Sequence, residues 1–197
     1  MNLAVIEGKW IKKRNTSVRG IFDLLSDITE DSPHAYHYEM FNDATAFREI
    51  FLRLSAARGV HHIYVASHGD TNCLAGTNDV PISKTIIKNT IIQAAEGKGR
   101  LDSVYFGCCS FGNPAMLKSL LSAGGALRWV AGFENEVDFI ESSAFDWLFW
   151  NAYNEIEGTA LERINVTVGK LRHDVPGLMT KLGFHVGVWD GGFKLLV

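Results

Sequence analysis

Two short apolar runs constrain the fold of this chain more than any other feature. The first, residues 62–67, stops at His68, and the second, residues 103–107, leads into the adjacent Cys108 and Cys109. Short apolar runs bounded by turn formers are typical of buried strands. Because α/β sheets present functional groups at the carboxyl ends of parallel strands, the pattern predicts two such strands that carry a histidine and a cysteine to one edge.

Strand-like and helix-like patterns alternate along the rest of the chain. Further strands are predicted at residues 3–6, 36–41 and 127–133, a short strand at 73–75, and a closing hairpin over 184–197 with its turn at 190–192. Neither a repeat nor a linker interrupts this alternation. The sequence therefore predicts one α/β domain over residues 1–197, with a single mostly parallel twisted sheet and helices on both faces.

Helices are predicted from amphipathic spacing and from the residues that begin them. Polar caps precede four of the predicted helices, at Asp43, Ser83, Asn113 and Asp138. The helix after Asp138 has its apolar face at Phe145, Leu148, Phe149, Ala152 and Ile156, and Glu141 is placed to complete a capping box. Another helix is expected at 159–173, followed by a break at 176–177.

Charge and composition exclude several classes of protein. A net charge of -3 leaves no electrostatic footprint for nucleic acid, because the only basic cluster, between Lys9 and Arg19, is short and interrupted. No apolar run reaches the roughly 18 residues of a membrane span. Three cysteines, two of them adjacent, do not form the even framework of a small secreted domain. We expect a soluble, cytoplasmic protein with neither nucleic acid nor a membrane as partner.

Neither a metal nor another cofactor is expected. Adjacent cysteines lack the Cys-x-x-Cys spacing of zinc sites, and His61 and His62 alternate faces along a strand. The chain also lacks an acidic loop of the kind that binds calcium.

A histidine and a cysteine at one sheet edge suit nucleophilic attack on a carbonyl, because a thiol attacks as its thiolate and needs a base nearby. Gly69 follows His68, and its backbone amide, together with the amide of Cys109, is placed to form an oxyanion hole. Ser67 and Asp70 flank the histidine and are expected to orient it and to contact the substrate. Strand periodicity leaves open which of the two adjacent cysteines points to the core.

The two segments resemble the catalytic blocks of the caspase-like (clan CD) cysteine peptidases. Ser67-His68-Gly69 is similar to the His-Gly motif of that group, and residues 104–109 are similar to its apolar strand, small residue and nucleophilic cysteine. The resemblance covers about residues 60–155, and small prokaryotic CHAT-type domains are the most similar members. It implies a caspase-like three-layer sandwich and a cysteine endopeptidase with Cys109 as nucleophile, His68 as its partner and a peptide or protein as substrate. A regulatory protein partner is also compatible with it.

The resemblance further implies where the residue before the cleaved bond would bind. In this chain that region carries Glu134, Glu136 and Asp138, and these acids would suit a substrate arginine or lysine. The alternative is that Asp138 only caps a helix and Glu134 is only solvated.

Two other functions fit parts of the sequence. Residues 107–111 partly imitate the strand-to-helix elbow of hydrolases, although the second glycine falls one place late. In that amidotransferase or hydrolase, a downstream histidine, His173 or His185, would be the base. The third reading is a catalytically silent scaffold, since a caspase-like fold does not by itself prove turnover.

Overall fold

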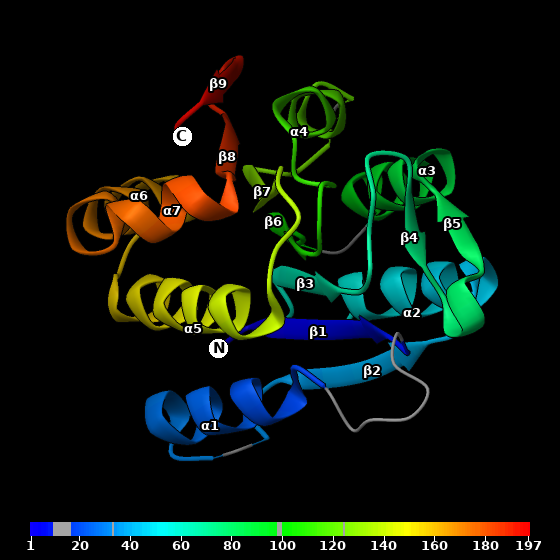
Figure 1. Ribbon diagram of the computed structural model, residues 1–197, viewed down its shortest axis with the longest axis horizontal. Helices are drawn as coiled ribbons and strands as arrows, with labels where there is room; N and C mark the ends of the chain where they lie inside the picture. The colour runs from blue at the N-terminus through cyan, green and yellow to red at the C-terminus, as the bar shows by residue number, and fades with distance from the viewer. Residues whose placement is uncertain (10–16, 33, 98–99, 124) are drawn as a thin grey trace.

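The computed structural model describes residues 1–9, 17–32, 34–97, 100–123 and 125–197 (Figure 1). Within these residues a seven-stranded sheet has the order β2-β1-β3-β6-β7-β8-β9. Its strands are β1 (Leu3–Gly8), β2 (His37–Phe41), β3 (His62–Ala66), β6 (Ser103–Gly107), β7 (Trp129–Phe133), β8 (Phe184–Trp189) and β9 (Phe193–Leu195). Within this sheet, β2, β1, β3, β6 and β7 pair in parallel, and β8 and β9 close it as an antiparallel hairpin. The predicted mostly parallel sheet and its closing hairpin are confirmed.

Helices cover both faces of the sheet (Figure 1). They are α1 (Arg19–Glu30), α2 (Ala44–Ser55), α3 (Lys84–Glu96), α4 (Pro114–Leu121), α5 (Phe139–Glu155), α6 (Ala160–Asp174) and α7 (Pro176–Leu182). A small antiparallel pair, β4 (Cys73–Ala75) with β5 (Pro81–Ser83), and a 3-10 turn (Thr77–Asp79) lie between β3 and α3. The predicted short strand at 73–75 is therefore confirmed, and its partner β5 is a strand that the sequence did not reveal.

Two apolar cores separate the three layers. Side chains of α2, α3 and α4 pack on one face of the sheet, and side chains of α1, α5, α6 and α7 pack on the other. Strand side chains alternate between the two cores: Ile63 and Val65 of β3 face the first, whereas Tyr64 faces the second. Burial on both faces explains why these strands read as continuous apolar runs.

The predicted caps begin their helices as expected. The side chains of Asp43, Ser83 and Asn113 accept hydrogen bonds from backbone amides in the first turns of α2, α3 and α4. Asp138 caps α5 in the same way, while the carboxylate of Glu141 pairs with Lys181 instead of closing a capping box.

Two helices were not predicted, and one expectation needs correction. Helix α1 was missed because Val18 at its start provides no side-chain cap. Helix α6 ends at Asp174, next to the predicted break at 176–177, but Pro176 there begins a further helix, α7, in whose first turn it needs no amide donor. On α5, the predicted apolar residue Leu148 is 36% exposed, whereas Trp150 and Tyr153 are buried, because this helix packs against the sheet, α1 and α6 together.

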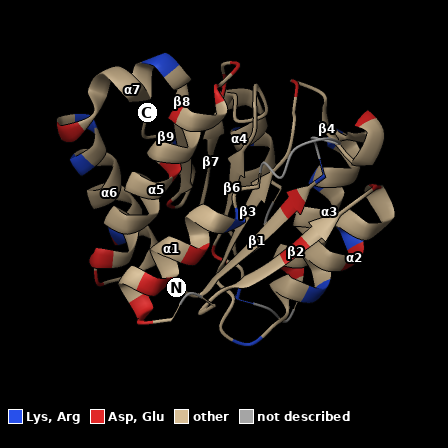
Figure 2. Cartoon of the chain, turned by 60° about the horizontal axis from the view of Figure 1, so that its bottom comes forward, with Lys and Arg blue, Asp and Glu red and all other residues tan. Residues whose placement is uncertain are grey.

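Over the described residues, charged side chains do not gather in one stripe. Figure 2 shows lysines and arginines scattered over the helices of both layers. Positions 10–16 of the basic cluster lie outside the described residues. Among the helices that are described, none combines the length and the apolar character needed to cross a membrane.

Candidate active site

The carboxyl edge of the sheet places the two singled-out segments on neighbouring strands. β3 and β6 pair in parallel, with Ala66 opposite Gly107. His68 and Cys109 each follow the paired residue of their strand by two positions, so they leave the edge at the same level. His68 is exposed and Cys109 is half-buried. The topology thus brings both groups to one rim, as the sequence predicts.

Gly69 lies directly against the backbone of the cysteine segment. A Cβ atom at Gly69 would be 2.8 Å from the carbonyl oxygen of Cys109 and 3.3 Å from the Cβ of Cys108. Any larger residue would therefore push the two segments apart. This contact, rather than the register alone, fixes how closely the histidine loop approaches the cysteine.

The amide of Gly69 points away from β4. Gly69 forms an antiparallel bridge with Leu74. The bonds that hold this bridge belong to the flanking residues: Asp70 N to Cys73 O at 3.0 Å, and Ala75 N to His68 O at 2.8 Å. A bridge flanked in this way is a non-hydrogen-bonded pair, so the amide of Gly69 faces outward. Within the described residues, neither this amide nor that of Cys109 donates a hydrogen bond.

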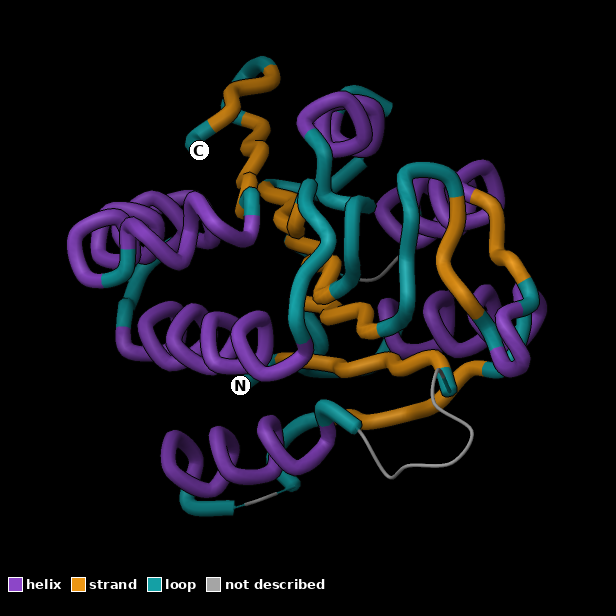
Figure 3. Tube along the Cα trace, viewed as in Figure 1, coloured by secondary structure: helices purple, strands orange, loops and turns teal. Residues whose placement is uncertain are grey.

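The loop after β7 covers the other side of the thiol. The amide of Val137 lies 3.4 Å from Sγ of Cys109, and the thiol lies 3.7 Å from the carbonyl oxygen of Val137. The amide of Ser110 donates to the carbonyl of Asn135 at 3.1 Å. The loops that leave β6 and β7 therefore run side by side (Figure 3). Sequence analysis missed Val137, because an ordinary apolar residue in a loop carries no chemical signal.

A left-handed residue follows the cysteine directly. Ser110 has φ 58°, a conformation that costs an L-residue about 1–2 kcal/mol. Such a turn redirects the chain from β6 into the cap of α4, where Asn113 Nδ2 donates to the carbonyl of Ser110. The tight turn leaves Cys109 at the edge instead of continuing the strand.

The two adjacent cysteines lie in different environments. Cys108 is 2% exposed and belongs to the core beneath α2, α3 and α4. Burial, with contributions from the Cys109 and Asp146 charges, raises the pKa of the Cys108 thiol well above its ordinary value. Cys108 is therefore a poor nucleophile, and it is the cysteine that points to the core, which strand periodicity left open.

A buried carboxyl lies beneath the same strand ends. Tyr64 and Tyr105, which pair across β3 and β6, each donate a 2.5 Å hydrogen bond to Asp146 of α5. Burial is the main cause that raises the pKa of Asp146 to about 7. A Cβ atom at Gly107 would lie 1.9 Å from the Tyr64 hydroxyl, so this glycine leaves room for the cluster. An acid in the middle of the aromatic helix α5, between Phe145 and Trp147, is the signal that could have revealed this cluster.

Ser67 and Asp70, the two residues expected to orient His68, form hydrogen bonds within the segment that follows it. Ser67 is buried and donates from Oγ to the carbonyl of Ala75 at 2.6 Å. Asp70 accepts hydrogen bonds from the amides of Asn72 and Cys73 and from the Cys73 thiol. The amide of Asn72 is the main cause that lowers the pKa of Asp70. These contacts shape the hairpin that follows His68.

The three predicted acids lie in the loop after β7, and all are exposed. Asp138 caps α5 through the amides of Ile140 and Glu141, and Glu134 accepts a 2.8 Å hydrogen bond from Nε2 of His185. Glu136 is the one whose carboxylate has no hydrogen bond or ion pair within the described residues.

The downstream histidines occupy different places from His68. His185 lies on β8 opposite Gly132 of β7, two strands from β6. His173 lies in the last turn of α6, exposed, and pairs with Asp174 at 2.8 Å. Neither lies on a strand next to β6.

A cleft of about 450 Å³ borders the loop after His68. Thr71, Lys84, Lys88 and Asn113 line it together with neighbouring residues of α3 and α4. The two lysines donate to neutral oxygens, of Asn72 and Ser119. The side of the site beyond His68 is therefore basic, whereas the loop after β7 is acidic. Within the part of the chain that is described, no group of three or more His, Cys, Asp or Glu side chains could hold a metal.

No protein-family model matches this chain, and no curated protein sequence is similar to it. Among solved structures, the fold is similar to that of a secreted C11 cysteine protease from Bacteroides thetaiotaomicron in complex with an irreversible peptide inhibitor. The TM-score is 0.53 at 7% sequence identity, and the match covers 94% of this chain and 65% of that chain. This likeness concerns the fold, and it confirms the predicted caspase-like three-layer sandwich. The closer resemblance to CHAT-type domains stays a prediction.

Proposed function

We propose that this chain is a cysteine endopeptidase of the caspase-like type. His68 accepts the thiol proton of Cys109 as Sγ attacks the carbonyl carbon of a peptide bond, and it passes this proton to the leaving amine as the C–N bond breaks. The amides of Gly69 and Cys109 hold the oxyanion, and water then hydrolyses the thioester.

The observation that carries this proposal is the close approach of the two strand ends. The β3–β6 register puts His68 and Cys109 at one level, and Gly69 touches the Cys109 carbonyl. The amide of Val137 lies 3.4 Å from Sγ and helps to hold the side chain of Cys109 at this edge. A nucleophile, a base and two unused amides are thus within one short stretch of the sheet edge.

Cleavage after a basic residue is the second part of the proposal. The exposed carboxylate of Glu136, in the loop that flanks Cys109, has no partner among the described residues, and Glu134 and Asp138 add negative charge next to it. A substrate arginine or lysine at this side would gain a favourable charge interaction. Ser67 and Asp70 support the opposite side by holding the His68 loop to β4.

Labelling with an irreversible peptide inhibitor tests the nucleophile. We expect one adduct per chain, located at Cys109 by mass spectrometry, and no adduct in the Cys109→Ala variant. The Cys73→Ala variant is the matched control, because it removes a half-buried thiol outside the dyad and should label like the wild type. Labelling that persists after Cys109→Ala would exclude the proposed nucleophile, and a folded wild type without any adduct would favour the silent scaffold.

Single histidine replacements separate the dyad from the elbow-type hydrolase. His68→Ala should abolish peptide cleavage, whereas His173→Ala and His185→Ala should retain it. The reverse pattern would replace our assignment with a downstream base. Matched peptides with Arg, Lys, Asp or Asn before the bond measure specificity, and preferential cleavage after Asp would refute the acidic subsite.

A further inference from the structure

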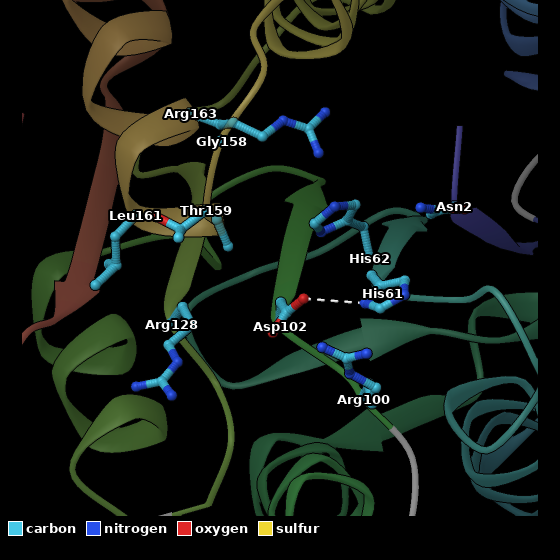
Figure 4. A pocket seen from close by; sticks show the side chains of 11 residues that line it. Asn2, His61, His62, Arg100, Asp102, Arg128, Gly158, Thr159, Leu161 and Arg163 are labelled. Carbon is cyan, nitrogen blue, oxygen red and sulfur yellow. Dashed lines mark hydrogen bonds and ion pairs between the residues drawn. The ribbon is translucent and has the colours of Figure 1, made fainter.

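A second polar cavity opens at the other edge of the sheet, where the strands begin (Figure 4). It encloses about 470 Å³ between the starts of β3 and β6, the segment before β7 and the start of α6. This edge is opposite to the one that carries His68 and Cys109, so the candidate active site does not account for it. A volume of this size matches pockets that take small molecules.

Three arginines give the cavity its charge. Arg100, Arg128 and Arg163 line it, and the guanidinium groups of Arg100 and Arg128 form no hydrogen bond or ion pair within the described residues. The acid present in the described lining is Asp102, which already pairs with His61 at 3.1 Å. The cavity therefore carries excess positive charge in a protein whose net charge is -3.

One of the arginines is fixed in place. Arg163 donates through Nε and Nη2 to the carbonyl oxygen of Tyr153, at 3.2 and 2.8 Å, and its guanidinium lies 4.0 Å from the centre of the Tyr153 ring. Figure 4 shows its side chain extending toward His62. A guanidinium held in this way loses little side-chain freedom when it binds an anion.

A buried histidine also faces the cavity. His62 is 2% exposed, and its Nδ1 lies 2.8 Å from the Ser103 hydroxyl. Its Nε2 has no hydrogen bond within the described residues, although the ring lines the cavity. Burial lowers the pKa of His62, so the ring is neutral and one of its nitrogens carries a proton. In the tautomer that accepts from the Ser103 hydroxyl at Nδ1, the proton is on Nε2, which can then donate to an anion in the cavity.

The first turn of α6 supplies further donors. Its cap is complete, since Thr159 and Glu162 bond each other's amides. The amides of Ala160 and Leu161 have no acceptor within the described residues, and both residues line the cavity. The positive end of this 15-residue helix adds to the attraction for an anion.

We propose that this cavity binds an anionic small molecule through a phosphate group. Guanidinium groups, backbone amides and a neutral imidazole line the cavity, and a phosphate is an anion with several acceptor oxygens that such donors bind. The concave shape of the cavity, and the scattered placement of lysines and arginines on the part of the chain that Figure 2 describes, favour a small ligand over a nucleic acid.

Calorimetric titration with inorganic phosphate and pyrophosphate tests the proposal. A titration with citrate at equal ionic strength shows whether a carboxylate anion binds as well as a phosphate. We expect saturable binding of pyrophosphate at one site per chain, tighter than that of citrate. Arg100→Gln and Arg128→Gln should each weaken it by about tenfold. Both side chains are exposed, so these variants should fold normally. Arg48→Gln, an exposed arginine on α2, is the matched control and should bind like the wild type.

The location of the anion-binding site is tested separately by NMR. The amide resonances of Ala160 and Leu161 should move with pyrophosphate in proportion to occupancy. Wild-type affinity in both Arg→Gln variants, shifts confined to other segments, or tighter binding of citrate would overturn the proposal. None of these readouts depends on peptidase activity, so the proposed function can fail without affecting this result.

Discussion

The Asp146→Asn substitution is expected to remove a pH dependence from the stability of this protein. Asp146 is 3% exposed and accepts hydrogen bonds from Tyr64 and Tyr105. Burial raises its pKa from 3.8 to about 7, and the two tyrosine hydroxyls oppose this rise only in part. The folded protein therefore keeps a proton that the unfolded chain releases near pH 4.

The size of the effect follows from the two pKa values. At about 1.36 kcal/mol for each pH unit between them, the carboxyl contributes about 4 kcal/mol of pH-dependent stability. Because the folded-state pKa is the higher one, this stability is complete below about pH 4 and is lost as the pH rises through about 7. Asparagine does not titrate, so the variant lacks the decline.

Urea unfolding followed by tryptophan fluorescence measures the effect at intervals between pH 4 and pH 8. The free energy of unfolding of the variant minus that of the wild type should increase by about 4 kcal/mol over this range, since all other titrating groups cancel in the difference. Asp27→Asn, an exposed position on α1, is the control and should give a flat difference. A flat difference for Asp146→Asn as well would refute the buried protonated carboxyl.

Three further substitutions test the geometry of the fold and the site. Gly69→Ala places a Cβ 2.8 Å from the Cys109 carbonyl oxygen, so we expect kcat/KM on the preferred peptide to fall about 100-fold. Unchanged turnover would contradict the oxyanion role of the Gly69 amide. Gly107→Ala puts a Cβ 1.9 Å from the Tyr64 hydroxyl and should cost about 1–3 kcal/mol in urea unfolding; a midpoint equal to that of the wild type would argue against this packing. Asp43→Ala removes the cap of α2 and should lower the free energy of unfolding by about 1 kcal/mol, measured in the same way, with no change in inhibitor labelling.

Much of the fold could be predicted because local signals and tertiary structure agree. Strands buried on both faces read as apolar runs, and polar caps such as Asp43 and Asn113 mark where helices begin. Prediction failed where tertiary contacts replace these signals. Helix α1 lacks a cap, and α5 is surrounded on several sides, so a single apolar stripe does not describe it.

The candidate site could likewise be predicted only in part from the sequence. His68 and Cys109 are placed by strand topology, which the alternation of strands and helices indicates. The contact of Val137 with the thiol depends on how a loop folds back from β7, and no periodicity encodes this. The burial of Cys108 could not be decided from the strand pattern, because the chain turns at Ser110 immediately afterwards.

The register between β3 and β6 decides which cysteine reaches the edge. A shift by one residue would turn every β6 side chain to the opposite face, placing Cys108 at the rim and Cys109 in the core. Tyr64 and Tyr105 are directly paired, their rings stack at 5.3 Å, and both hydroxyls bind the one carboxyl of Asp146. After such a shift, Tyr105 would face the α2–α4 layer and leave Asp146 with one partner fewer in a buried position, which is costly. The cluster on one face of the sheet therefore holds the register that places His68 and Cys109 at one level of the sheet edge.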